Sequence, residues 1–185
     1  TNQVIGAYSG ILAGTYNTTT YDYAVVLGGS NNTAYAYSGV LAGYNNAAYS
    51  TYAVILGGRN NTASGMFSAV IGGTENKLSS SSSALSSIIV GGSENVVSNY
   101  YSSVVGGLKN TTSGSASIVA GGSENKASTW FSSVCGGYGN TASGMYSSVI
   151  GGSGNTASGL NSSVVGGQRR TASNTYESAT GILNN

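Results

Sequence analysis

The side chains of this chain that could do chemistry are few and scattered. Its 185 residues include six basic side chains, five acidic ones and no histidine. The acids form no pair placed for acid–base catalysis; they are Asp22, Glu75, Glu94, Glu124 and Glu177. Without histidine, the usual nucleophile–base triads and His-based metal sites are absent. The sequence therefore predicts a protein that is not an enzyme, with no catalytic residue, no metal site and no cofactor.

The charge, the cysteine content and the hydropathy of the chain exclude several other classes of protein. The net charge of +1, with only 6% charged residues, is not the footprint of a nucleic-acid binder. The single cysteine, Cys135, cannot form a disulfide within the chain, and no stretch is apolar enough to span a membrane. We therefore expect no nucleic-acid partner and no membrane insertion. Because the chain begins with Thr1 rather than Met, we also expect a processed or trimmed product.

Asparagine, serine and threonine supply most of the remaining polar groups. Five N-glycosylation sequons begin at Asn17, Asn31, Asn60, Asn110 and Asn161. In a chain so rich in these residues most sequons arise by chance, and they matter only if a secretory pathway that glycosylates makes the protein.

A repeat of about fifteen residues must position all of these groups. Its most regular mark is a glycine at residues 14, 29, 43, 58, 73, 92, 107, 122, 137, 152 and 167, which we number position 0. The spacing is 15 except for one step of 14 and one of 19. A period this short and strict predicts an all-β parallel solenoid of about twelve coils, forming a single domain over residues 1–185. The step of 19 predicts a four-residue loop insertion around residues 78–85 that does not break the stack.

Two neighbouring apolar rows run through the repeat. Position −3 is always β-branched, which suits a stacked core row: Ile11, Val26, Val40, Ile55, Val70, Ile89, Val104, Val119, Val134, Val149 and Val164. Position −2 is also apolar throughout: Leu12, Leu27, Leu41, Leu56, Ile71, Val90, Val105, Ala120, Cys135, Ile150 and Val165. Adjacent strand residues point to opposite faces, so we expect one row to fill the coil and the other to face a second body.

Position −6 is aromatic in nine copies, and stacking between coils would make it a ladder: Tyr8, Tyr23, Tyr37, Tyr52, Phe67, Tyr101, Phe131, Tyr146 and Tyr176. Strand alternation would place this row on the same face as position −2. It could stiffen the rod or its interface, or it could bind a glycan or another surface.

Position +3 is asparagine in nearly every copy, with Arg170 as an exception. Its main members are Asn17, Asn32, Asn46, Asn61, Asn76, Asn95, Asn110, Asn125, Asn140 and Asn155. Stacked amides can bond from coil to coil, so the column predicts a structural asparagine ladder. The glycines at positions −1 and 0 predict corners where φ is positive.

The run Ser148, Val149, Ile150, Gly151 and Gly152, followed by Ala157 and Gly159, resembles the head repeats of YadA-like trimeric autotransporter adhesins. Related repeats occur in phage and viral fibres. The resemblance covers essentially the whole chain and implies a left-handed β-roll, three chains side by side and a role in adhesion.

Together these patterns favour a structural protein, outside the cell, on its surface or in a virion fibre. It would assemble with copies of itself into a fibre or multimeric stalk through its apolar and aromatic ladders. One alternative is an adhesin head that binds glycans or a host surface. Another is an ice-binding solenoid, which would use Thr62 with Ser64, Thr141 with Ser143 and Thr156 with Ser158, in a ladder that Lys77, Val96 and Lys126 interrupt.

Overall fold

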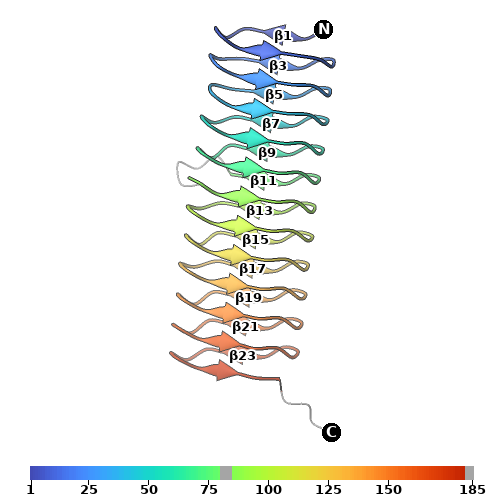
Figure 1. Cartoon of the computed structure of the whole chain (residues 1–185). Coiled ribbons are helices and arrows are strands. Elements are labelled where there is room, and N and C mark those ends of the chain that lie inside the picture. Colours follow the sequence, from blue (N-terminus) through green and yellow to red (C-terminus); the bar gives the residue numbers. More distant parts are fainter. Residues whose placement is uncertain (80–84, 182–185) are drawn as a thin grey trace.

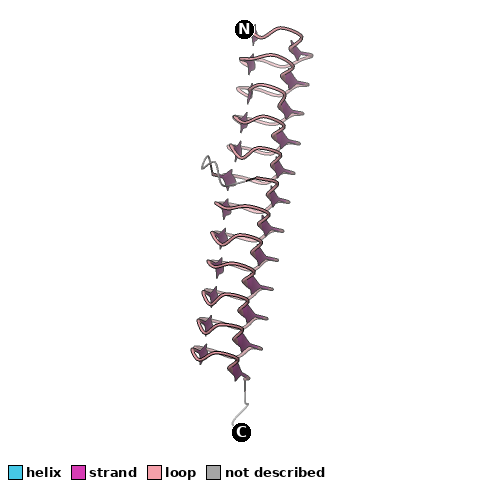
Figure 2. Ribbon diagram, turned by 90° about the vertical axis from the view of Figure 1, so that its left-hand side faces the viewer, coloured by secondary structure: helices cyan, strands magenta, loops and turns pink. Residues whose placement is uncertain are grey.

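The computed structural model describes residues 1–79 and 85–181 and shows the parallel β-solenoid that the repeat predicts. The chain winds in left-handed coils into a straight rod, with its two ends at opposite ends of the stack (Figure 1). Within the described residues it forms two twelve-stranded parallel sheets, which lie on opposite sides of the coil (Figure 2). Residues 80–84 of the expected insertion lie outside the described part. Both sheets continue across the insertion, because Ala69 pairs with Ile88 in one sheet and Lys77 pairs with Val96 in the other.

Each coil contributes one two-residue strand to each sheet. The odd-numbered strands hold positions +4 and +5: β1 (Gln3–Val4), β3 (Thr18–Thr19), β5 (Thr33–Ala34), β7 (Ala47–Ala48), β9 (Thr62–Ala63), β11 (Lys77–Leu78), β13 (Val96–Val97), β15 (Thr111–Thr112), β17 (Lys126–Ala127), β19 (Thr141–Ala142), β21 (Thr156–Ala157) and β23 (Thr171–Ala172). The even-numbered strands hold positions −4 and −3: β2 (Gly10–Ile11), β4 (Val25–Val26), β6 (Gly39–Val40), β8 (Val54–Ile55), β10 (Ala69–Val70), β12 (Ile88–Ile89), β14 (Ser103–Val104), β16 (Ile118–Val119), β18 (Ser133–Val134), β20 (Ser148–Val149), β22 (Ser163–Val164) and β24 (Ser178–Ala179).

The narrow core lies between the two sheets. Position −3 is fully buried from Val26 to Val164, and it is matched from the other sheet by a buried row at position +5. That second row is mostly alanine, as at Ala34 and Ala142, which lets the two sheets approach closely. Every strand pairs in register with the same positions one coil away, so equivalent side chains stack directly on one another.

The corners depend on backbone of left-handed conformation. The glycine at position 0 has φ between +85° and +103°. A non-glycine residue follows at +2 in most coils, as at Glu75 (φ +57°), and position −6 forms a third such corner. The glycine at position −1 does not share this conformation, so the expectation of two glycine corners is wrong for its first member.

Candidate functional site

The outer face of the even-numbered sheet carries a column of exposed apolar side chains beside a row, at position −4, that is uncharged but often serine or glycine. All eleven side chains at position −2 are exposed, and the nine large ones among them range from 37% at Ile71 to 80% at Leu12. They form one column along the rod, and we call this column with its outward neighbours at position −4 the aliphatic face. None of the charged residues of the chain occupies position −2 or −4. Contiguous apolar surface of this kind marks interaction sites in soluble proteins.

The only cysteine of the sequence lies within this face. Cys135 stands at position −2 of its coil, is exposed and makes no disulfide. Its neighbours along the column are Ala120 and Ile150. The thiol is therefore a natural reporter of whether the face is open or covered.

The aromatic row at position −6 lies at a corner of the coil and not in a strand. Tyr23 and Tyr146 both have φ of +58°, and each donates its N–H back to the preceding coil, to Ala7 and to Trp130 respectively. Burial nevertheless alternates from position −6 to position −2, so both rows are exposed, in line with the expected alternation. Tyr101 of the aromatic row is 68% exposed.

Most rings of this row stack face to face. Five of them form a continuous ladder from Tyr8 to Phe67, with centroids 4.9–5.6 Å apart, in which only the Tyr37–Tyr52 pair is tilted, by 44°. Phe131 and Tyr146 stack at 5.1 Å. The interplanar angle is 11° between Tyr52 and Phe67 and 5° between Phe131 and Tyr146. Rings stacked in this way cover most of each other's faces and present their edges to solvent.

The asparagine column at position +3 is buried and bonds along the rod. The side-chain Oδ1 of Asn110 accepts the backbone N–H of Asn125 at 3.0 Å. Its Nδ2 donates to the carbonyl of Gly106 in its own coil and to that of Gly122 in the next, both at 2.9 Å. The same three bonds recur from Asn17 to Asn155, so each amide bonds to backbone rather than to the next amide.

The structure shows two further polar rows that the sequence reasoning missed. Position −5 is buried serine in most coils, and the hydroxyls of Ser102 and Ser117 each donate to the carbonyl three residues earlier. Those of Ser147 and Ser162 are buried without a hydrogen-bond partner. At position +2, Asn31, Asn45 and Asn60 bond side chain to side chain at 3.0 and 2.9 Å. A serine held at one phase of the repeat was the available signal, but serine alone does not indicate burial.

The outer face of the odd-numbered sheet is more polar than the aliphatic face. Position +4 is often threonine, and Thr62, Thr141 and Thr156 are half-buried there. The ladder expected of an ice-binding solenoid lies on this face. Lys77 and Lys126 project from it as exposed charges and divide it into short sections.

The ionisable groups are isolated or weakly paired. Lys109 and Glu94 approach to 3.7 Å at the exposed +2 corner. The hydrogen bond with Glu124, together with its negative charge, raises the pKa of Tyr138, whereas the backbone N–H groups of Asn174 and Ser173 lower the pKa of Glu177. Among residues 1–79 and 85–181, no three histidine, cysteine or acidic side chains cluster where they could hold a metal ion.

Burial decides where the sequons could carry a glycan. Asn17 and Asn110 are fully buried members of the +3 column, so neither could be glycosylated in this fold. Asn31, Asn60 and Asn161 lie at corners with φ of +54° to +61° and are at least partly exposed.

The chain matches no protein-family model and no curated protein. In the described ranges, no helix is long and apolar enough to cross a membrane.

Proposed function

We propose that this chain is a non-enzymatic structural protein that associates side by side with copies of itself into a fibre or stalk. The observation that carries the proposal is the aliphatic face, an uncharged column of eleven exposed apolar side chains along the whole rod. Complete burial of one aliphatic side chain contributes about 1.5–3 kcal/mol to the stability of an assembly. Partial burial contributes less for each side chain, but the contributions add along the column.

The distribution of charge supports the same choice of face. Lys77 and Lys126 project from the odd-numbered sheet, and Glu75, Glu94, Lys109 and Glu124 lie at the +2 corner. Charged side chains on a β surface discourage association there. No charged side chain occupies position −2 or −4. A second copy that packs on the aliphatic face therefore removes no charged group of that face from water, so the free energy cost of desolvation is lowest there.

Sedimentation velocity over a range of concentrations, with negative-stain electron microscopy, tests the proposal. We expect the wild-type protein to form multimers or fibres. A triple variant at position −2, Leu56→Lys with Val105→Lys and Ile150→Lys, should remain monomeric because it places charge along the face. Its matched control, Thr62→Lys with Thr111→Lys and Thr156→Lys, adds the same charge to the opposite sheet and should assemble like the wild type.

Maleimide labelling of Cys135 gives an independent readout. The thiol should react readily in the dilute monomer and should be protected in the assembled protein. A wild-type protein that stays monomeric at every concentration overturns the proposal. So does an assembly that the position −2 variant keeps and the position +4 variant loses.

A further inference from the structure

One coil is a residue shorter than its neighbours, and the structure is hollowed there. The step from Gly29 to Gly43 is 14 residues, whereas the steps on either side are 15. The turn after β3 contains Tyr21, Asp22 and Tyr23, and the turn after β7 contains Ser50, Thr51 and Tyr52, but the turn between them has only Ala36 and Tyr37. The short turn recesses the surface between two longer ones.

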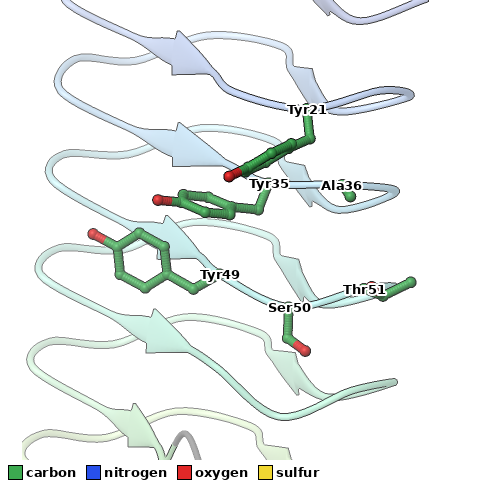
Figure 3. A pocket seen from close by; sticks show the side chains of 6 residues that line it. All are labelled: Tyr21, Tyr35, Ala36, Tyr49, Ser50 and Thr51. Atoms are coloured by element: carbon green, nitrogen blue, oxygen red, sulfur yellow. The ribbon is translucent and has the colours of Figure 1, made fainter. Parts of the chain in front are cut away.

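The resulting hollow measures about 240 Å³ and is lined by residues of three successive coils. They are Tyr21, Tyr35, Ala36, Tyr49, Ser50 and Thr51 (Figure 3). The volume is below the range of roughly 300–1,000 Å³ that is usual for sites taking drug-sized ligands. A small ligand, or one unit of a longer one, would fill it.

Neither pair of these three tyrosines stacks face to face, whereas in the ladder at position −6 all pairs but Tyr37–Tyr52 do. The rings of Tyr21 and Tyr35 lie 5.2 Å apart at an angle of 48°, and those of Tyr35 and Tyr49 lie 5.1 Å apart at 83°. Figure 3 shows the rings fanned out, with their hydroxyl groups on the same side. Rings tilted in this way do not cover each other's faces, and Tyr21 and Tyr49 are 53% and 47% exposed.

The chemistry of the hollow is neutral and rich in hydroxyl groups. No charged side chain lines it, and the nearby carboxylate of Asp22 accepts the backbone N–H of Ala7 at 2.8 Å. The side-chain hydroxyls of Ser50 and Thr51 make no hydrogen bond to another described residue. A sugar ring has complementary groups, because its C–H face packs on an aromatic face while its hydroxyls donate and accept hydrogen bonds.

We propose that Tyr21, Tyr35 and Tyr49, with Ser50 and Thr51, bind one neutral pyranose unit of a glycan. A proline-rich peptide is less well matched, because such segments dock along an extended aromatic groove, whereas this hollow spans only three coils. None of the lining residues belongs to position −2 or −4, so this site does not depend on the proposed assembly.

Saturation-transfer NMR with the intact chain tests the site. The probes are maltohexaose, cellohexaose, chitohexaose and mannohexaose, with hexagalacturonic acid, in which every unit is anionic, as the charged comparison and a proline-rich decapeptide as the rival ligand. At least one neutral oligosaccharide should receive saturation, whereas hexagalacturonic acid and the peptide should receive none. Tyr49→Ala should weaken that binding about tenfold, the factor that a lost aromatic contact typically carries.

A second variant tests the hollow without removing a ring. Inserting one glycine between Tyr35 and Ala36 restores the fifteen-residue period and should fill the recess, so binding should be lost while the circular dichroism spectrum is kept. Tyr44→Ala removes an exposed tyrosine from another corner and should bind like the wild type.

Three results would overturn the proposal. The first is the absence of saturation transfer to every neutral probe. The second is binding that survives both Tyr49→Ala and the glycine insertion, which would place the sugar elsewhere. The third is binding of the peptide in place of the sugars. Sedimentation velocity of the same variants tests the assembly proposal separately. Variants that lose sugar binding should still associate like the wild type.

Discussion

At the residue scale, the asparagine at position +3 is the most constrained side chain of the coil. Its amide has one acceptor and two donor hydrogens, and in Asn110 each of these functions has a backbone partner at 2.9–3.0 Å. Aspartate has the same shape but lacks both donors, and it would face two carbonyl oxygens. The repeat therefore selects asparagine for its hydrogens and not merely for its fit to a turn.

We predict that Asn110→Asp lowers the free energy of unfolding at neutral pH by at least about 2 kcal/mol, because a buried carboxylate cannot be satisfied there. Burial and the two carbonyls should raise the pKa of the new carboxyl in the folded state above its unfolded value. The folded protein then binds the proton more tightly, so the loss should shrink as the pH falls through the raised pKa. Urea unfolding between neutral and acidic pH measures this.

The matched control for that variant is Asn161→Asp. Asn161 lies at a corner where it is partly exposed, with φ of +54°, and aspartate tolerates this conformation. Its variant should unfold like the wild type at neutral pH. An Asn110→Asp protein whose stability equals that of the control at every pH would contradict the proposed role of the amide hydrogens.

At the scale of the turn element, two adjacent glycines have unequal roles. Gly122 has φ of +85°, and a Cβ added to it would lie 2.2 Å from the carbonyl oxygen of Gly137. The same atom would lie 2.5 Å from Nδ2 of Asn125. Gly121 has no atom within 4 Å of an added Cβ. The second glycine thus brings the corner of one coil against the backbone of the next, whereas the first does not need to be glycine.

We predict that Gly122→Ala lowers the free energy of unfolding by at least about 2 kcal/mol, from left-handed strain and contact with the next coil. Gly121→Ala should change it by less than about 0.5 kcal/mol, or raise it slightly by restricting the unfolded chain. Thermal unfolding of the two variants in parallel gives the comparison. Equal losses in both would show that the corner is not the cause.

Strand alternation predicts which residues of a coil are buried, but it does not predict where each short strand ends. Alternation holds within a strand, so the burial of Val149 and the exposure of Ile150 could be derived from their adjacency. The same in–out pattern continues to Ser147, which is buried, and to Tyr146, which is exposed, but the sequence did not show that Tyr146 lies at a left-handed corner outside the strand Ser148–Val149. Ser147 was missed because a serine does not by itself indicate burial.

The tyrosine hollow lies beyond sequence reasoning for a further reason. The step of 14 residues is visible in the sequence, but which side of the coil loses the residue is not. The structure shows that the turn containing Ala36 is shortened while β5 and β6 keep their register. Only then do Tyr21, Tyr35 and Tyr49 from three coils become neighbours.

At the scale of the whole molecule, the rod is a one-dimensional stack. Each strand pairs only with the equivalent strands one coil before it and one coil after it. The asparagine column obeys the same rule, because Asn140 bonds to the backbone of its own coil and of the next one. Stability in such a stack is close to a sum over coils and their interfaces. Keeping the phase of the repeat is therefore more important for a folded rod than keeping the number of coils.

We predict that deleting the complete coil 138–152, which joins Gly137 to Ser153, leaves a folded and slightly shorter rod. The backbone N–H of Asn155 bonds to Oδ1 of Asn140 at 2.9 Å in the intact chain, and after the deletion it should bond to Oδ1 of Asn125. Deleting the half-coil 138–145 removes the strand Thr141–Ala142 and Asn140 together, so the coils beyond it lose their register. Hydrogen exchange distinguishes the two outcomes. The Asn155 amide should stay protected in the first variant and exchange rapidly in the second, and equal protection in both would show that the phase does not hold the stack together.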